Sequence, residues 1–384
     1  MVFVSNINLS DSISRSNFQP RAATIANRRL SRVTCFVHSA ITWIEHTGVW
    51  APWIFTGIFL AASFLSIWCL ECMSDDGMEG TVLGTLVTPY ITGFGNLVFA
   101  FILGRNHGPA TEVMTMCLVN NVTNMTLVLG LPAIFWNLSL FAGKKDSAKK
   151  PDKPGKSAKA GKPAKADKAA TTREVNRLSL LLTLVAILFF TGTAWVVGSD
   201  GRIDFNDGLV LIGLFLFWQC FHVFEVLKTN ARNKRSFGWL FPFYLLLLAV
   251  GAWAIYVSSD WLVTWVSSRS KGFISEQHLG WLSGWLNVLP NAMLAVYYAW
   301  TKRPEIVVTS QVGDAHICIP LCIGVFALFQ TIVVPPFFAT GVIILLAATV
   351  VHLFFFGLFG RLPWYIGVLL VAAYAWFLYD GLLK

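Results

Sequence analysis

The chain alternates between long apolar runs and short polar turns over most of its length. A run of roughly 20 apolar residues is long enough for an α-helix to cross the hydrocarbon of a bilayer. Such helices are expected at 51–72, twice within 91–132, and at 175–198, 207–228, 238–258, 273–300, 305–330, 335–357 and 362–382. The pattern therefore predicts an all-α membrane protein with about ten transmembrane helices.

Polar side chains interrupt two neighbouring runs in the stretch Ile91–Pro132. One helix carries Asn96 in mid-span, and the next carries Asn120, Asn121 and Asn124. A polar side chain at membrane depth is costly unless it faces the interior of the bundle or a cavity. The stretch is therefore a candidate functional site.

A weaker copy of this stretch lies at Leu286–Val325. In the first copy Asn96 is followed by an apolar run, a basic turn and a proline, and then by Asn120 after 24 residues. The same order follows Asn291 in the second copy, with Asp314 after 23 residues. A repeated five-helix unit inverts its topology, and transporters built in this way hold their sites near the bilayer midplane. Two inverted five-helix repeats are therefore expected.

The two copies resemble the signatures of the cation/calcium exchanger superfamily, which includes sodium/calcium and calcium/proton antiporters. The G-T-S-L-P-E signature aligns with Ile91–Asn96 and Leu286–Asn291. The later S-N-x-x-N or D cluster aligns with Asn120–Asn124 and Asp314–Cys318. The resemblance implies ten spans and a cation site formed by both repeats. It covers roughly residues 85–135 and 280–328, together with the topology.

The departures from these signatures concern charge. Family members carry a glutamate at the end of each signature, and the resemblance implies that these two carboxylates carry much of the calcium site. Here Asn96 and Asn291 stand at both positions, and Cys318 stands where the family has Asn or Asp. Losing two negative charges weakens the binding of a divalent cation, because affinity follows the charge of the ligands.

The expected site therefore offers one carboxylate among neutral oxygens. Such a site suits one monovalent cation, or a proton on Asp314. The sequence predicts a secondary active antiporter that works by alternating access, with sodium, calcium, potassium or protons as partners and a shift away from calcium. No cofactor is expected, and no resident metal is assigned beyond a metal cation bound as substrate. The predicted ligands are Thr92, Asn96, Asn120, Asn124, Asn287, Asn291 and Asp314.

Two other classes of function were weighed. In the first, the protein is a transport-inactive membrane scaffold or sensor that keeps the exchanger fold, and its asparagines only form hydrogen bonds between helices. In the second, the protein is a membrane enzyme. The chain has no HExxH motif, no histidine cluster and no GxSxG motif, so an enzyme is not expected.

The net charge of +9 is concentrated in two segments. Residues 143–170 hold ten Lys and three Asp, and residues 1–35 hold five Arg and one Asp. The basic excess thus belongs to tails and loops, and nucleic acid is not an expected partner. The expected organisation is 1–35 (disordered or targeting), 36–142 (interfacial helix and spans one to three), 143–174 (linker without structure), 175–237 (spans four and five) and 238–384 (second half).

The basic loops also predict sidedness. The linker and the clusters at Lys228–Arg235, Lys302–Arg303 and Arg361 all follow odd-numbered spans, so they lie on one side of the membrane. The positive-inside rule makes that side cytoplasmic. There the 143–174 linker is interpreted as a solvated spacer, and attraction of its lysines to anionic lipid headgroups is the alternative.

Several other residues have a simple interpretation. The cysteines that lie in apolar runs are interpreted as small buried hydrophobes; they are Cys117, Cys220, Cys318 and Cys322. Glu112 is expected to line the access path near the outer end of its helix. His316 lies two residues beyond Asp314, about 200° away on a regular helix, and is expected to face elsewhere.

Overall fold

The structure, a computed structural model, describes residues 39, 41–75, 93–136, 138–140, 164–230 and 240–384. The chain divides into two units, Met1–Ile54 and Phe55–Lys384. In the first unit, residues 41–45 are helical and η1 (Gly48–Trp50) leads into α2 (Ala51–Asp75). The second unit contains the rest of the described chain. Thr92, one of the predicted ligands, lies outside the described residues.

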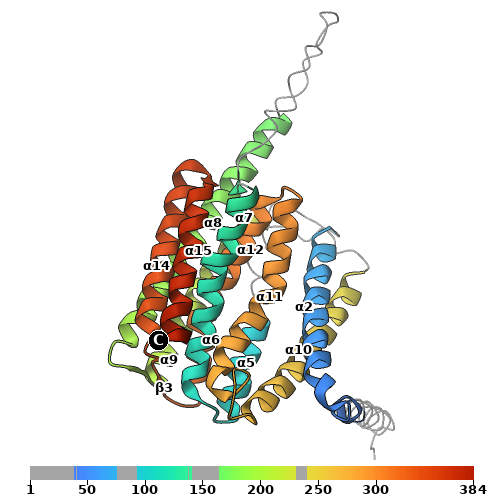
Figure 1. The fold of residues 1–384 in the computed structure, drawn as a ribbon. Helices are drawn as coiled ribbons and strands as arrows, with labels where there is room; N and C mark the ends of the chain where they lie inside the picture. The colour runs from blue at the N-terminus through green and yellow to red at the C-terminus, as the bar shows by residue number, and fades with distance from the viewer. Residues whose placement is uncertain (1–38, 40, 76–92, 137, 141–163, 231–239) are drawn as a thin grey trace, which may run out of the picture. The chain divides into compact units, whose positions relative to one another are not determined.

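The described chain is almost entirely helical (Figure 1). The first half contributes, after α2, α5 (Phe94–Arg105), α6 (Ala110–Val122), η3 (Thr123–Val128), α7 (Leu129–Trp136), α8 (Ala164–Val197) and α9 (Phe205–Asn230). The second half contributes α10 (Phe241–Ser267), η4 (Glu276–His278), α11 (Leu279–Trp300), α12 (Pro304–Ile317), η5 (Cys318–Ile323), α13 (Gly324–Ala327), α14 (Phe338–Phe354), η6 (Phe355–Phe359), α15 (Trp364–Leu378) and η7 (Tyr379–Leu383).

These helices match the predicted spans. Within the described residues, 7 helices are long and apolar enough to cross a membrane, and α5 and the apolar part of α9 are shorter. One predicted boundary is wrong: α8 begins at Ala164, inside the 143–174 linker that was expected to lack structure. Alanine and lysine are strong helix formers, so the last residues of that segment extend the helix. Residues 141–163 lie outside the described residues.

The two halves interleave. From the first half, α5 packs against η5 and α13 of the second half. From the second half, α11 packs against α6 and η3 of the first half. Figure 1 shows α11 running beside α6. The polar positions of each half therefore face the other half rather than lipid.

At two further places, a helix of one half crosses a helix of the other half at short distance. A Cβ at Gly367 of α15 would lie 2.6 Å from the carbonyl oxygen of Gly130 in α7. A Cβ at Gly324 of α13 would lie 3.0 Å from the carbonyl oxygen of Gly208 in α9. Small residues at helix interfaces let backbones approach closely in membranes, where dispersion contacts replace the hydrophobic effect as the source of association.

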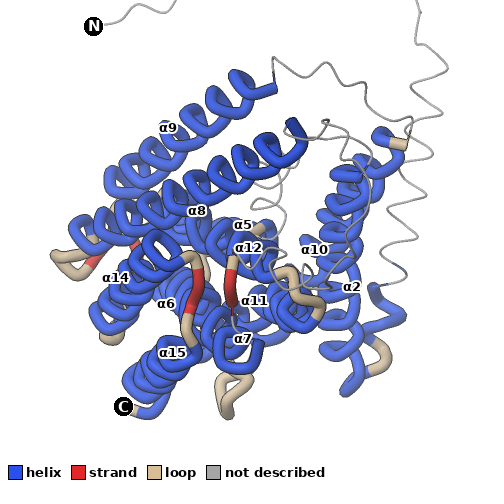
Figure 2. The backbone as a smooth tube through the Cα atoms, turned by 90° about the horizontal axis from the view of Figure 1, so that it is seen from above, coloured by secondary structure: helices blue, strands red, loops and turns tan. Residues whose placement is uncertain are grey.

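Two short sheets also join the halves. β1 (Leu138–Ser139) pairs antiparallel with β4 (Arg361–Leu362), and β2 (Arg202–Ile203) pairs antiparallel with β3 (Ile332–Val333). Figure 2 shows these strands in red between the helices. β1 follows α7, and its partner β4 lies in the turn between η6 and α15. β3 follows α13, and its partner β2 lies in the turn between α8 and α9. The same arrangement thus occurs twice, with the roles of the halves exchanged.

The two copies keep one register. His107 and Lys302 have positive φ, of 52° and 59°, and each lies just before a helix that starts at a proline. The π-helical segments η3 and η5 begin at Thr123 and Cys318. Both pairs are 195 residues apart, since 302 − 107 and 318 − 123 give the same value. Asn96 and Asn291 obey the same offset, which supports the repeat.

Candidate cation site

The centre of the candidate site is a buried carboxylate that accepts hydrogen bonds from two amides. Asp314 Oδ2 accepts from Asn124 Nδ2 at 2.7 Å and from Asn120 Nδ2 at 3.2 Å. All three side chains are fully buried. The amides replace part of the water shell that the carboxylate would lose in this interior. The cluster joins α6 and η3 of the first half to α12 of the second, so three predicted ligands do come together.

Asn120 and Asp314 contact each other across the interface between the two repeats, but they do not occupy equivalent positions in the two copies. The constant offset of 195 pairs Asn120 with Ala315 and Asp314 with Val119. The sequence alignment of Asn120 with Asp314 is therefore one residue out. The contact arises because α6 and α12 carry their polar residues on faces that lie against each other.

The local backbone helps to place these side chains. The segments η3 and η5 are π-helices, which occur most often as single wide turns at functional sites. In η5, Pro320 has no N–H group, which leaves the preceding turn short of one donor. Asn121 Nδ2 donates to the carbonyl oxygen of Ala315 in that turn at 2.9 Å. Asn121, which was outside the predicted ligand set, thus ties the two repeats together.

Several buried amide oxygens in this region have no hydrogen-bond partner among the described residues. They belong to Asn121, Asn124 and Gln311. The amide nitrogen and oxygen of Asn96 also have no hydrogen-bond partner there. A buried polar atom without a partner costs about 1–3 kcal/mol. Such atoms are rare in native structures, and one of them, the Asn124 amide oxygen, belongs to a side chain that donates to Asp314. Oxygen acceptors with one carboxylate suit a cation.

Asn287 and Asn291 surround a second, smaller feature. They line a pocket of about 10 Å³ together with Gly95 and Pro290, roughly the room that one water molecule needs. A Cβ at Gly95 would lie 2.4 Å from Asn287 Oδ1, so only glycine fits where the two signatures cross. Gln311 Nε2 donates to the carbonyl oxygen of Asn291 at 3.2 Å. Gln311 was missed in the sequence, although it lies three residues before Asp314 on the same helical face.

Glu112 does not line an access path. Its Oε2 accepts the backbone N–H of Gly280 at 2.6 Å, and the side chain is buried. The first N–H groups of a helix lack intrahelical partners, so Glu112 of α6 caps α11 from outside. A Cβ at Gly280 would lie 2.4 Å from the Glu112 carbonyl oxygen, which shows how closely the two helices cross. This expectation is therefore replaced by a structural role.

His316 is buried beside α9. Its Nδ1 lies 2.6 Å from the carbonyl oxygen of Gly313, and its ring centroid lies 6.4 Å from that of Phe215. Of the four cysteines interpreted as buried hydrophobes, Cys220 is exposed, so that interpretation is wrong there. The other three, Cys117, Cys318 and Cys322, are buried and lie close together. No sequence signal pairs them, because Cys117 is 201 residues from Cys318.

The comparisons with known proteins agree with this geometry. A sodium/calcium exchanger protein family model matches residues 48–224 and 243–380, one segment in each half. The solved sodium-calcium exchanger NCX_Mj, soaked with 2.5 mM Na⁺ and 10 mM Sr²⁺, is 18% identical with a TM-score of 0.58, over 85% of this chain and 96% of that chain. With 10 mM Na⁺ and zero Ca²⁺, the same exchanger gives 18% identity and a TM-score of 0.57, over 87% and 98% of the two chains.

No curated protein matches the chain. The likeness to NCX_Mj shows the fold, and the family matches cover most of the sequence. They confirm the resemblance, the all-α membrane architecture in two repeats and the class of transporter rather than enzyme. The chain is a multi-pass integral membrane protein that belongs to the sodium/calcium exchanger family.

Proposed function

We propose that this chain is a secondary active cation antiporter that works by alternating access, and that the cluster around Asp314 is its cation site. The observation that carries the proposal is the cluster itself. One fully buried carboxylate accepts hydrogen bonds from amides of the opposite repeat, and the oxygen of one of these amides, Asn124, has no partner among the described residues. A site shared by two repeats changes shape when the repeats move relative to each other, which is what alternating access requires.

The preferred ion in this proposal is a monovalent cation or a proton rather than calcium. In the described residues, Asp314 and Glu112 are the buried carboxylates, and Glu112 is occupied by the N–H of Gly280. One positive charge on Asp314 leaves the site neutral. A calcium ion would leave one uncompensated charge in the interior, which is costly. The amides at Asn96 and Asn291 supply oxygen without adding charge.

The proposal includes the sidedness of the basic loops. The 143–174 linker is cytoplasmic and contacts anionic lipid through its lysines. The support is the parity of the basic loops along the spans. Lys302 and Arg303, at the turn between α11 and α12, are exposed. Labelling of single cysteines placed in this linker and in the turn at 200–201, in right-side-out vesicles, tests the assignment. The linker site is expected to be protected and the turn to be reached by reagent, and the reverse pattern contradicts the orientation.

Flux through reconstituted proteoliposomes tests the central claim. The wild type, Asp314→Asn and Asp200→Asn are compared under sodium, potassium, calcium and proton gradients. Asp200 is a matched control, because its carboxylate is exposed and pairs with Arg202 at 3.4 Å. We expect monovalent-cation or proton flux in the wild type and in Asp200→Asn, and flux at the protein-free level in Asp314→Asn.

Two results would change the conclusion. If calcium moves as fast as sodium, potassium and protons, the altered preference is wrong while the antiporter stands. If no gradient drives flux, and cations raise the melting temperature of wild type and Asp314→Asn equally, the protein is a scaffold or sensor with the exchanger fold. Stabilisation is informative here because a ligand stabilises the state that binds it by mass action.

A further inference from the structure

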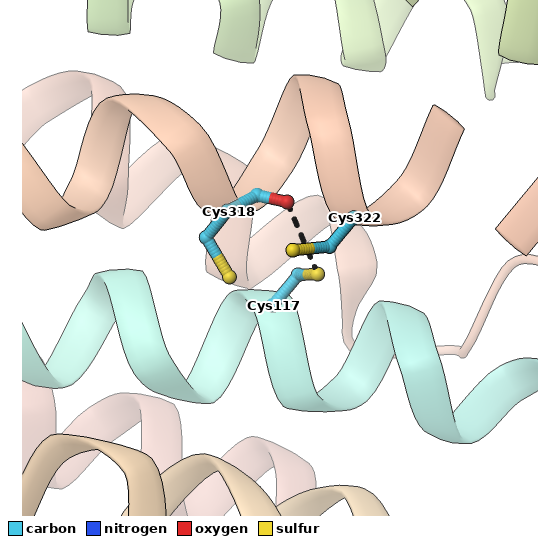
Figure 3. Close-up of side chains that lie close together, drawn as sticks. All are labelled: Cys117, Cys318 and Cys322. Carbon is cyan, nitrogen blue, oxygen red and sulfur yellow. Dashed lines mark hydrogen bonds between the residues drawn. The ribbon is translucent and has the colours of Figure 1, made fainter. Parts of the chain in front are cut away.

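Three buried thiols meet at the interface between the repeats. The sulfur atoms of Cys117, Cys318 and Cys322 all lie within 4.8 Å of one another, and all three residues are buried. Figure 3 shows Cys117 from α6 pointing toward Cys318 and Cys322 on the facing segment. Each half of the chain therefore supplies part of the cluster, as in the site around Asp314.

The backbone fixes the directions of these side chains. Cys318 and Cys322 are four residues apart in η5, so both face the same neighbour. Cys117 Sγ donates to the carbonyl oxygen of Cys318 at 3.4 Å, which holds the third sulfur at the interface (Figure 3). The three thiols are thus brought together by the same crossing that positions Asn120 and Asp314.

The sulfur positions suit a metal ion. A Zn–S bond of about 2.3 Å in tetrahedral geometry places two sulfurs roughly 3.8 Å apart. The cluster therefore needs to contract by about 1 Å or less to hold an ion of this size. Three cysteine sulfurs favour soft ions such as Cu⁺, Zn²⁺ or Cd²⁺, while calcium and magnesium prefer oxygen.

We propose that Cys117, Cys318 and Cys322 form a binding site for one thiophilic metal ion that bridges the two repeats. With Zn²⁺ or Cd²⁺, two of the three cysteines release their thiol protons to solvent, and all three donate a sulfur lone pair. Two thiolates and one neutral thiol leave the site without net charge and with one open coordination position. The site uses none of the atoms of the cluster around Asp314, so metal binding does not depend on whether the chain transports other cations.

The position also gives an ion bound there a mechanical effect. Because Cys117 belongs to the first repeat and the other two cysteines to the second, a bound metal ties α6 to η5. Alternating access needs these elements to move relative to each other. Metal binding is therefore expected to slow any flux that the protein catalyses.

Cadmium binding tests the site directly. The full chain is purified in detergent under a phosphine reductant, in a background where Cys35, Cys69, Cys72 and Cys220 are replaced by serine. In this background only the cluster can bind through sulfur. We expect one Cd²⁺ per chain by elemental analysis after desalting, together with the ultraviolet absorption band of a cadmium thiolate. Changing Cys117, Cys318 and Cys322 to serine as well is expected to remove both signals.

Single substitutions distinguish the loss of a metal ligand from a failure of the protein to fold. Cys322→Ala in the same background is expected to raise the Kd for Cd²⁺ at least tenfold, with the elution volume in gel filtration unchanged. Asp200→Asn, which removes an exposed carboxylate outside the cluster, is the control and is expected to keep one Cd²⁺ per chain. The proposal is overturned if the background variant binds no Cd²⁺ with a cadmium–thiolate band, or if the serine triple variant binds as much as the background.

Discussion

The two copies of the repeated hairpin share a backbone but differ in chemistry. Both have a positive-φ residue before the second helix, a proline at its start and a π-helical segment at its end. The first copy, Phe94–Val128, brings amides and one cysteine, Cys117, to the interface, and its buried carboxylate, Glu112, accepts the Gly280 N–H. The second, Leu279–Ile323, offers Asp314 and two cysteines in addition to amides. The difference shows that the skeleton depends on turns and packing, while the ligand set depends on a few positions that can change independently.

The largest effect is expected from restoring the two carboxylates that the family signatures carry. The double change Asn96→Glu and Asn291→Glu places a carboxylate at the signature position of each repeat. Calcium is then expected to stabilise the protein by up to about 2.7 kcal/mol when it is present at 100 times its Kd, and not to stabilise the wild type. Melting temperatures in detergent, measured with and without calcium, check this.

The matched control places both glutamines instead, because glutamine has the shape of glutamate without its charge. Calcium stabilisation of the glutamine variant would mean that charge is not what the wild type lacks. Equal calcium stabilisation in the wild type and in the glutamate variant would show that the native amides already bind calcium.

The crossings between the halves test whether the shared skeleton depends on close approach. Gly367→Ala puts a Cβ against the Gly130 carbonyl oxygen and is expected to cost about 1–3 kcal/mol, the usual range for overpacking. Gly213→Ala in α9 is the control, since a Cβ there meets nothing within 4 Å. Alanine is the better helix former by about 1 kcal/mol, so this variant is expected to match or exceed the wild type. Thermal unfolding followed by circular dichroism measures both.

Glu112 tests a feature that only one copy has. Glu112→Gln keeps an acceptor for the Gly280 N–H but loses the charge near the start of α11, and is expected to cost about 1 kcal/mol. Glu305→Gln, which removes an exposed carboxylate at the start of α12, is expected to change the free energy of unfolding by less than half of that. Chemical denaturation of the two variants side by side makes the comparison. An equal effect of both changes would remove the capping role.

The smallest expected effect concerns the two turns. His107 and Lys302 both adopt the left-handed conformation, which glycine accepts without a Cβ penalty but with a larger loss of chain entropy. His107→Gly and Lys302→Gly are each expected to shift the free energy of unfolding by a few tenths of a kcal/mol. The two shifts are expected to have the same sign and size. A large difference between them, measured by thermal unfolding, would mean that the turns are not equivalent.

The sequence predicted the parts of this molecule that depend on local pattern. Apolar runs located the helices, and the pairing of Asn96 with Asn291 located the repeat. The limits of α8 were missed because alanine and lysine favour a helix even where nothing apolar is buried. The register between Asn120 and Asp314 was one residue out, because a contact between crossing helices can look like an equivalence between copies.

The features that depend on long-range crossing could not be predicted in this way. The cysteine cluster joins residues 201 positions apart, and nothing in the spacing of Cys117 indicates its partners. Glu112 was expected to line the access path, because an acid in a membrane helix usually serves function. Only the position of α11 beside α6 shows that this carboxylate accepts a backbone N–H instead.

The two small sheets have a consequence for biosynthesis. β1 follows α7 early in the chain, but its partner β4 lies at Arg361–Leu362, close to the C-terminus. The ribosome must therefore translate more than 200 further residues before β4 can pair with β1. The helices of the first half are therefore synthesised before the strand that pairs with β1. A nascent chain that stops before Arg361 leaves the backbone groups of Leu138 and Ser139 without their strand partner, and unpaired strand edges are prone to pair with other chains.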